Sequence, residues 1–400
     1  MKIAFLSNYF NHHQKPLSDA FYSLLGDGNY YFIETMNMSE SRKEMGWREI
    51  TAPYVIKYSK ENSTKVEDII KTFDVIIHGS TPLSLVKQRY NHKEKLTFQY
   101  SERRYKTISR YLCYPIYTIR SHYINKGYLL SASAYAPIDY LLSGMKLERC
   151  FRWGYFPEVK TYDSPEILIE KKGLKHSQGV SILWAGRLIG LKHPESTIFV
   201  ARRLKADGVN FELNIIGTGK LENKIMSLIQ QYNLVDFVHM LGPMTQEEVR
   251  RHMEEADIFL FTSDRHEGWG AVLNESMNSG CAVVADENIG SVPYLIKDKE
   301  NGLIYKSTNW QDLYNKVIYL VTHPKERKTM GKNAYNTMHN IWNSKTAAEN
   351  FIKICESIIY NTDNPIKVGP CSAAPLVMTK WKYFQTIRRV ISQKFLTNYL

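Results

Sequence analysis

The chain has 400 residues, 44% of them hydrophobic and 23% charged, which predicts two or three domains of ordinary globular composition. That composition excludes a wholly disordered or collagen-like chain, and no run approaches the ~20 apolar residues of a membrane-spanning helix. The net charge of +12 predicts an anionic partner: nucleic acid, a phosphate-bearing substrate or an anionic membrane face.

The cysteines and the N-terminus indicate a cytoplasmic protein. An odd number of widely spaced cysteines without a CxxC pair predicts neither a disulfide framework nor a zinc site, and is typical of a reducing compartment. The apolar run at residues 3–6 is too short for a signal peptide and predicts a first buried strand. The five cysteines are Cys113, Cys150, Cys281, Cys355 and Cys371.

Short apolar runs alternate with amphipathic stretches along the chain. Helical spacing covers 220–232 and 246–255, and the second helix has Thr245 as N-cap with Glu248 three residues later. This alternation predicts parallel sheets covered by helices, with ligands at the carboxyl ends of the strands. The predicted strands are 3–6, 74–78, 96–100, 181–185, 211–216, 237–240, 258–262 and 282–285.

A polar, turn-rich stretch at 157–179 indicates a connection between two α/β domains. We expect a first domain over 1–160, a linker over 161–179 and a second domain over 180–345. A helix over 346–362 follows the second domain, and a basic amphipathic tail over 363–400 ends the chain.

Two loops of the second half carry candidate phosphate-binding residues. Gly186 ends a predicted strand and lets backbone approach a ligand, while Arg187 and Lys192 can grip two phosphates as a fork and a point charge. Gly217 and Gly219 end the next strand before a helix whose N-terminus suits an anion. Solvated surface charge and a plain tight turn are the alternative interpretations of these two loops.

The sharpest pattern is a pair of glutamates. A buried strand at 258–262 leads through a polar loop to Glu267, a Gly268-Trp269-Gly270 turn and a helix that carries Glu275. A rise of ~1.5 Å per residue places the two carboxylates at most ~12 Å apart. That separation suits the two ends of one extended ligand, with a diphosphate between them over the helix N-terminus. A loop charge and a surface helix residue are the alternative roles.

Residues 180–305 resemble the C-terminal domain of the family 4 retaining glycosyltransferases, which have the GT-B fold. The resemblance implies an α/β protein of two Rossmann-like domains facing across a cleft, with the helix after residue 345 crossing back to the first domain. The two glutamates reproduce the E-x7-E motif of that family. The other matching features are Gly186-Arg187 with Lys192, Gly217-Thr218-Gly219, Leu241-Gly242-Pro243, 256–263, Asn274-Glu275, 279–284 and 301–304.

The resemblance also implies a role for each site residue. Arg187 and Lys192 would bind the donor's pyrophosphate, beside Gly186, and Gly217 and Gly219 would line the nucleotide crevice. Glu275 would hydrogen-bond the ribose of the nucleotide. Glu267 would hold the transferred sugar, together with the backbone N–H groups of Gly268, Trp269 and Gly270.

The first domain departs from the better-known members of that family. Their glycine-rich loop after the first strand is absent, and His12 and His13 stand there instead. Glu102 follows a strand where such enzymes often carry a cleft histidine, and His78 ends another strand. These four residues are our acceptor-side candidates. Capping or surface positions for His12 and His13, and a buried structural role for His78, remain open.

Two basic stretches predict contact with an anionic membrane. Residues 87–126 mix Lys and Arg with tyrosines and contain only Glu94 and Glu102 as acids, and 380–395 has cations and apolar residues at near-helical spacing. A solvated helix face is the alternative for the first stretch, and packing onto the first domain is the alternative for the second.

The function implied is retaining transfer of a sugar from a UDP- or GDP-linked donor to a saccharide acceptor, lipid-linked, in bacterial capsule or other surface polysaccharide synthesis. The family that the chain resembles does not depend on a D-x-D metal motif, and the sequence has none, so the enzyme would need no metal ion or other cofactor. It would lie peripherally on the inner face of the plasma membrane. A nucleotide-sugar isomerase or epimerase on the same fold is the alternative. Charge alone supports nucleic-acid binding, and we expect no nucleic-acid partner.

Overall fold

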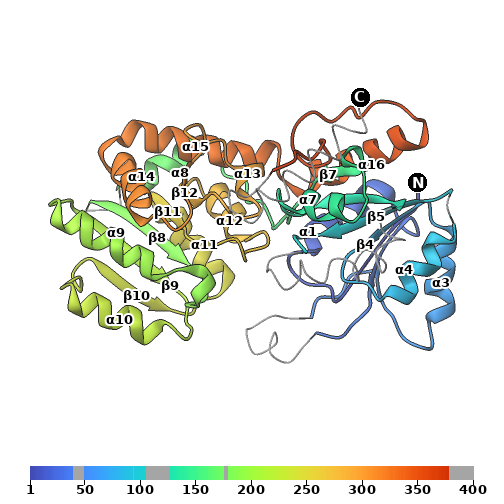
Figure 1. Cartoon of the computed structure of the whole chain (residues 1–400), viewed down its shortest axis with the longest axis horizontal. Coiled ribbons are helices and arrows are strands. Elements are labelled where there is room, and N and C mark those ends of the chain that lie inside the picture. The colour runs from blue at the N-terminus through green and yellow to red at the C-terminus, as the bar shows by residue number, and fades with distance from the viewer. Residues whose placement is uncertain (39–48, 93, 105–125, 175–178, 378–400) are drawn as a thin grey trace.

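Two parallel β-sheets, one in each half of the chain, organise the protein (Figure 1). The computed structural model describes residues 1–38, 49–92, 94–104, 126–174 and 179–377. Both sheets are covered by helices on their two faces, as expected for parallel strands whose residues are buried on both sides. The prediction of an α/β protein with two Rossmann-like domains is confirmed.

The first sheet has the strand order β3-β2-β1-β4-β5-β6-β7, and every pair in it is parallel. Ile3 and Phe5 of β1 face one core and Ala4 and Leu6 face another, which is the period-two alternation of a strand buried on both sides. The helices are α1 (Lys15–Leu25), α3 (Ser63–Thr72), α4 (Leu83–Tyr90) and α7 (Ala136–Leu142). The strands are β1 (Ile3–Ser7), β2 (Tyr30–Glu34), β3 (Val55–Lys57), β4 (Val75–His78), β5 (Leu96–Ser101), β6 (Tyr128–Ser131) and β7 (Cys150–Arg152).

The second sheet repeats that order as β10-β9-β8-β11-β12-β13. The strands are β8 (Val180–Ala185), β9 (Phe211–Ile216), β10 (Val238–Gly242), β11 (Ile258–Phe261), β12 (Ala282–Asp286) and β13 (Leu303–Tyr305). The helices are α9 (Glu195–Ala206), α10 (Glu222–Gln231), α11 (Gln246–Glu255), α12 (Val272–Asn278), α13 (Val292–Leu295), α14 (Trp310–Thr322) and α15 (Pro324–Asn340). The order reverses between β8 and β11, and a crevice at such a reversal is where these folds bind ligands.

All eight predicted strands are present, and α11 has the predicted capping box. Thr245 Oγ1 accepts a hydrogen bond from the backbone N–H of Glu248 at 3.3 Å, and Glu248 Oε2 accepts one from the backbone N–H of Thr245 at 2.8 Å. Five strands were missed: β2, β3, β6, β7 and β13. Three of them, β3, β7 and β13, have only three residues each, which is too short for a periodic signal.

The stretch expected to be a linker contains a helix, α8 (Pro165–Leu174), that packs on the second domain. Lys172 on α8 is buried, and its ammonium group donates hydrogen bonds to the carbonyls of Met253 at 2.8 Å and Ala256 at 2.7 Å. These carbonyls end α11, and a buried cation there satisfies acceptors that the helix leaves unpaired.

The last described helix, α16 (Ser344–Ile359), returns to the first domain and packs against α1 (Figure 1). The ring of Phe351 lies 5.6 Å from that of Phe21 and 4.8 Å from that of Phe98. The chain then forms an antiparallel bridge between Ala373 and Phe151 of β7. The predicted crossing-back helix is therefore present, and the part of the expected tail up to residue 377 packs on the first domain.

Two of the cations in the basic stretch 87–126 are buried and do not lie on the surface. Arg89 is completely buried, and its guanidinium donates to the carbonyls of four residues: Ile70, Phe73, Asp74 and Leu96. Arg103 is buried beside Asp139 at 3.8 Å. Both cations have structural partners, so the expectation that they face a membrane is wrong. Residues 105–125 and the amphipathic segment 380–395 lie outside the described residues. Among the helices described, none combines the length and the apolar character needed to span a bilayer.

Candidate functional site

The candidate donor site lies at the carboxyl ends of the central strands of the second sheet. Arg187 and Lys192 follow β8, Gly217 and Gly219 follow β9, and Glu267 follows β11. Because β9, β8 and β11 are neighbours in a parallel sheet, these loops emerge at the same edge. The topology thus brings together residues that are up to eighty positions apart in the sequence.

The two glycine-containing loops are in direct backbone contact. A β-carbon on Gly217, whose φ is 129°, would lie 1.9 Å from the carbonyl oxygen of Gly186, and one on Gly219 would lie 2.5 Å from that of Leu188. The N–H of Leu188 also donates to the carbonyl of Thr218 at 2.9 Å. Only glycine fits at these positions, since any side chain would force the two loops apart.

Lys192 and Glu267 form an ion pair between the β8 and β11 loops. Their side chains are only 15% and 16% exposed, so solvent screens the pair weakly. Arg187, in contrast, is exposed at the rim. The structure thus brings together the residue expected to bind phosphate and the residue expected to hold the sugar.

Asp264 links the β11 loop, in which it lies, to the β8 loop. Its carboxylate lies 3.3 Å from His193 Nε2 and 2.9 Å from His266 Nδ1, and its backbone N–H donates to the carbonyl of Leu191 at 2.9 Å. Burial alone would raise the pKa of Asp264, but the hydrogen bonds from His193 and His266 outweigh it and lower the pKa to about 2. Hydrogen bonds to Asp264 and Glu195 raise the pKa of His193 to about 9, so its ring is a cation at neutral pH.

Glu275 lies in the first turn of α12, near the start of the helix as predicted. Its Oε1 accepts a hydrogen bond from Gln246 Nε2 at 2.8 Å. The guanidinium of Arg250 donates to the Glu275 carbonyl and to Asn278 Oδ1, at 2.8 and 2.9 Å. Burial raises the pKa of Glu275, and the charge of Arg250 opposes that rise. Gln246 thus holds the carboxylate of Glu275, and Arg250 holds its backbone carbonyl.

The Trp269 side chain joins the two domains and is fully buried. Its ring lies against Gly154, where a β-carbon would be 2.3 Å from the indole, and its Nε1 donates to Asn274 Oδ1 at 2.8 Å. Asn274 Nδ2 in turn donates to the carbonyl of Tyr155 at 3.2 Å. The indole is therefore structural, and only the backbone of Trp269 is available for the role that the resemblance implies.

Glu102 reaches from the end of β5 in the first domain to the Glu267 turn of the second. A β-carbon on Gly268 would lie 1.7 Å from Glu102 Oε2, so the carboxylate rests directly on the glycine. Glu102 Oε1 accepts a hydrogen bond from the Tyr155 hydroxyl at 2.6 Å. Burial, together with Tyr100 and Glu102, raises the pKa of Tyr155 well above its ordinary value, so this hydroxyl stays a donor.

Two of the three histidine candidates, His12 and His13, lie side by side, and His78 lies elsewhere. His13 lines a small pocket, and its ring lies 4.1 Å from that of His12 and 6.1 Å from that of Tyr155. Burial lowers the pKa of His12. His78 is 1% exposed and shares a sheet face with Ile76, which α3 and α4 cover. Burial, and then the charge of Arg89, lowers the pKa of His78 to about 3. This position fits the structural role left open for His78.

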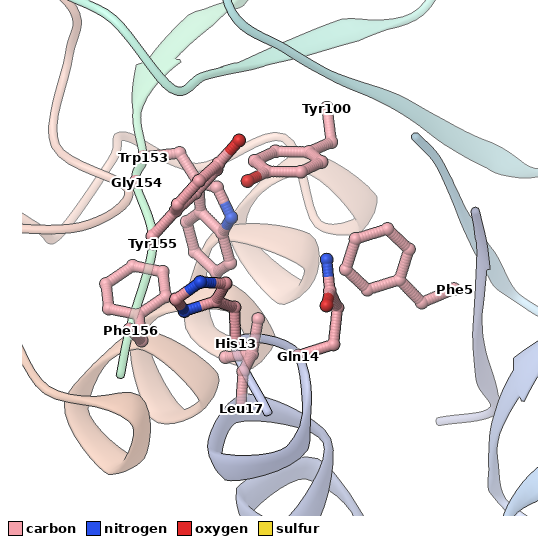
Figure 2. Close-up of a pocket in the computed structure, with 9 residues that line it drawn as sticks. All are labelled: Phe5, His13, Gln14, Leu17, Tyr100, Trp153, Gly154, Tyr155 and Phe156. Atoms are coloured by element: carbon pink, nitrogen blue, oxygen red, sulfur yellow. The ribbon is translucent and has the colours of Figure 1, made fainter. Parts of the chain in front are cut away.

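The pocket lies in the first domain beside Tyr155 (Figure 2). His13 and Gln14 directly precede α1, and Tyr100 lies at the end of β5; their side chains point into the pocket, as Figure 2 shows. A lining of aromatic side chains with few polar groups is typical of small-molecule sites. The lining residues are Phe5, His13, Gln14, Leu17, Tyr100, Trp153, Gly154, Tyr155 and Phe156.

Several site residues were not singled out from the sequence. His193 directly follows Lys192, and Asp264 lies in the loop before Glu267. Their closeness in sequence to these charged candidates could have pointed to them. Gln246 and Tyr155 gave no such signal, since an amide on a helix and a tyrosine after a strand occur in any globular chain. Their roles depend on α11 lying beside α12 and on the path of the chain between the domains.

Comparison with known proteins gives one family match for part of the chain and several structures with the same fold. The family described as glycosyl transferases group 1 matches residues 166–337. The structure of HepE from Anabaena in complex with UDP aligns with a TM-score of 0.65 at 14% identity, covering 89% of this chain and 100% of that one. The outer-core lipopolysaccharide galactosyltransferase WaaB aligns with a TM-score of 0.62 at 15% identity, covering 90% and 99%. The fold is GT-B, as predicted.

Two relatives are named as bacterial glycosyltransferases. The amylovoran biosynthesis glycosyltransferase AmsK of Erwinia amylovora is 38% identical over 130 residues, 31% of this chain and 32% of that protein. An N-acetylgalactosaminyltransferase of Campylobacter jejuni, named for a diphospho-undecaprenol-linked acceptor, is 30% identical over 173 residues, 43% of each chain. The chain thus spans less than half the length of these curated relatives.

Proposed function

We propose that the protein is a retaining glycosyltransferase that moves a sugar from a nucleotide-sugar donor to a saccharide acceptor in bacterial surface polysaccharide synthesis. The observation that carries the proposal is the Lys192–Glu267 pair, set between the glycine loops after β8 and β9. It combines a cation for a diphosphate with a carboxylate for sugar hydroxyls. The match of residues 166–337 to glycosyl transferases group 1 supports the proposal independently.

The charges of the site suit the departure of a nucleoside diphosphate. When the bond between sugar and phosphate breaks, negative charge grows on the phosphate and positive charge on the anomeric carbon. Lys192, with Arg187 at the rim, would stabilise the phosphate, and Glu267 would hold the sugar beside it. Fixed groups of this kind stabilise a transition state commonly by several kcal/mol. The leaving phosphate would accept the proton of the attacking hydroxyl.

We base the proposal that the anomeric configuration is retained on the linkages in the names of two relatives. The Campylobacter relative is named for a 4-alpha linkage, and a poly(ribitol-phosphate) transferase of Staphylococcus aureus, 23% identical over 217 residues, for an alpha-N-acetylglucosaminyl product. An α-product from an α-linked nucleotide sugar preserves the anomeric configuration. We propose the same outcome here, with Glu275 at the ribose and with UDP, which HepE binds, as the nucleotide to test first.

For the acceptor we propose a lipid-linked saccharide that enters from the first domain. The supporting observations are the pocket beside Tyr155 and His13 and the lipid-linked acceptor in the name of the Campylobacter relative. A peripheral position on an anionic membrane belongs to the same proposal. No observation favours the isomerase alternative, which needs no acceptor site.

Release of free nucleoside diphosphate tests the proposed function. The purified protein is incubated with UDP- and GDP-sugars, with and without extracted lipid-linked saccharides, and diphosphate release is measured. Acceptor-dependent release supports transfer, whereas conversion of one nucleotide sugar into another without release supports an isomerase. The Glu267→Gln variant should lose the release, and Glu148→Gln, an exposed glutamate of the first domain, should keep it.

A further inference from the structure

Two carboxylates from different domains meet at one turn of the candidate site. Glu267 lies in the turn itself, and Glu102 rests on the next residue, Gly268, against the position of its missing β-carbon. Lys192 forms an ion pair with Glu267. The turn implied to hold the transferred sugar therefore carries one carboxylate and is touched by a second.

Glu102 is held in this position by the protein. The Tyr155 hydroxyl donates to its Oε1 at 2.6 Å, and the Tyr155 backbone is tied to α12 through Asn274 at 3.2 Å. Asn274 also accepts from the Trp269 indole of the same turn. The carboxylate and the turn therefore share one network of hydrogen bonds, which fixes the negative charge relative to the sugar subsite.

We propose that Glu102 is a specificity-determining residue that makes this subsite accept neutral sugars and reject hexuronic acids. The inference rests on the proposed function. A bound donor would place its diphosphate near Lys192 and thereby take up the cation that Glu267 now pairs with. The sugar would then face two carboxylates, which accept hydrogen bonds from hydroxyl groups. A hexuronate would bring a third carboxylate into the same space.

The physical basis is repulsion between like charges in a poorly solvated site. A sugar hydroxymethyl group can donate a hydrogen bond to either glutamate, whereas the carboxylate that replaces it in a hexuronic acid cannot. The repulsion is stronger here than in bulk water because the effective dielectric constant is lower. Specificity built on a repulsive contact against the wrong ligand is a common device in proteins.

The test compares donors that differ only at this group. Binding of UDP-glucose and UDP-glucuronic acid, UDP-galactose and UDP-galacturonic acid, and GDP-mannose and GDP-mannuronic acid is measured by calorimetry, together with diphosphate release. Wild type should bind the neutral member of its preferred pair at least about 20-fold more tightly. Glu102→Gln, which has the same shape without the charge, should reduce that ratio at least about fivefold. Glu148→Gln, an exposed control, should leave it unchanged.

Two results would overturn the inference while leaving the proposed function intact: equal binding of the neutral and acidic members by wild type, or an unchanged ratio in Glu102→Gln. If wild type binds no nucleotide sugar of any pair and releases no diphosphate, the proposed function fails, and the inference fails with it. The binding ratio is read without an acceptor, so an unidentified acceptor cannot obscure the outcome.

Discussion

The carboxylate of Glu102 rests on Gly268, so a side chain of the first domain touches the turn of the second domain that carries Glu267. The contact joins the two halves of the GT-B fold at the candidate reaction centre. It needs glycine at 268 because any β-carbon there would overlap the carboxylate.

Gly268→Ala tests this contact. Glu102 is the flexible partner, so the new methyl group should displace its carboxylate and leave the fold intact. We expect kcat/KM to fall about tenfold or more, as for Glu102→Ala, and the double variant to be no worse than the poorer single one. Gly190→Ala, a loop glycine with nothing within 4 Å of its added β-carbon, should keep wild-type activity. Additive losses in the double variant would mean that Gly268 acts independently of Glu102.

The Lys192–Glu267 pair makes a similar prediction about catalysis. Lys192→Ala and Glu267→Gln should each lower turnover at least about tenfold, and the double variant should lose little more, because each residue depends on the other. Removing the exposed pair Lys146 and Glu148, whose charged atoms are 3.6 Å apart, should leave turnover unchanged. Full turnover in both single variants on the true donor would remove these residues from the site.

His193 should make stability depend on pH. Its pKa is raised to about 9 in the folded protein, from 6.5 in the unfolded chain. The folded state therefore binds more protons than the unfolded state between pH 6.5 and 9. The stabilisation is fully present below pH 6.5 and is lost as the pH rises through 9; it is on the order of 1–2 kcal/mol, discounted for solvent exposure.

Denaturant titrations at pH 6, 7.5 and 9.5 check this sign. His193→Gln should flatten the decline in the free energy of unfolding, while His323→Gln, at an exposed position, should retain the wild-type slope. A decline that is the same in both variants would assign the pH dependence to other groups.

Docking of α16 depends on Phe351, whose ring lies between Phe21, Phe98 and Trp153. Phe351→Ala removes a fully buried ring and should cost about 3–5 kcal/mol of unfolding free energy. Tyr360→Ala, at a residue that is 75% exposed, should change stability by less than about 0.5 kcal/mol. Equal stability of the two variants would show that α16 contributes little to the first domain.

Metal independence is a separate expectation. Turnover should persist in EDTA, since we propose that the cations Lys192 and Arg187 compensate the phosphate charge. Recovery of activity by added Mg²⁺ or Mn²⁺ after chelation would contradict this. The measurement uses the purified protein with its donor and acceptor.

The sequence indicated the fold well because the buried strands of both sheets are short apolar runs of the expected length. It did not indicate β3, β7 and β13, whose three residues each carry no periodic signal. Arg89 looked like a surface cation among others, yet four backbone carbonyls of the first domain surround it. Those carbonyls are brought to it by the packing of α3, α4 and β5, which no local pattern encodes.

The sequence predicted many of the residues of the candidate site, but it did not predict which of them contact one another. Lys192 and Glu267 are each visible as charged residues beside glycines, but their contact depends on β8 and β11 being neighbours. The Glu102–Gly268 contact depends further on how the two domains face each other. Tyr155, which donates a hydrogen bond to Glu102, follows β7 near the end of the first domain, in a segment without a periodic pattern.

A structure of the protein with an intact nucleotide sugar tests the central claim most directly. The account predicts the diphosphate at Lys192 and Arg187, the sugar against Glu267 and the Gly268 backbone, and the ribose at Glu275. A complex with the diphosphate bound elsewhere and the Lys192–Glu267 pair undisturbed would contradict it.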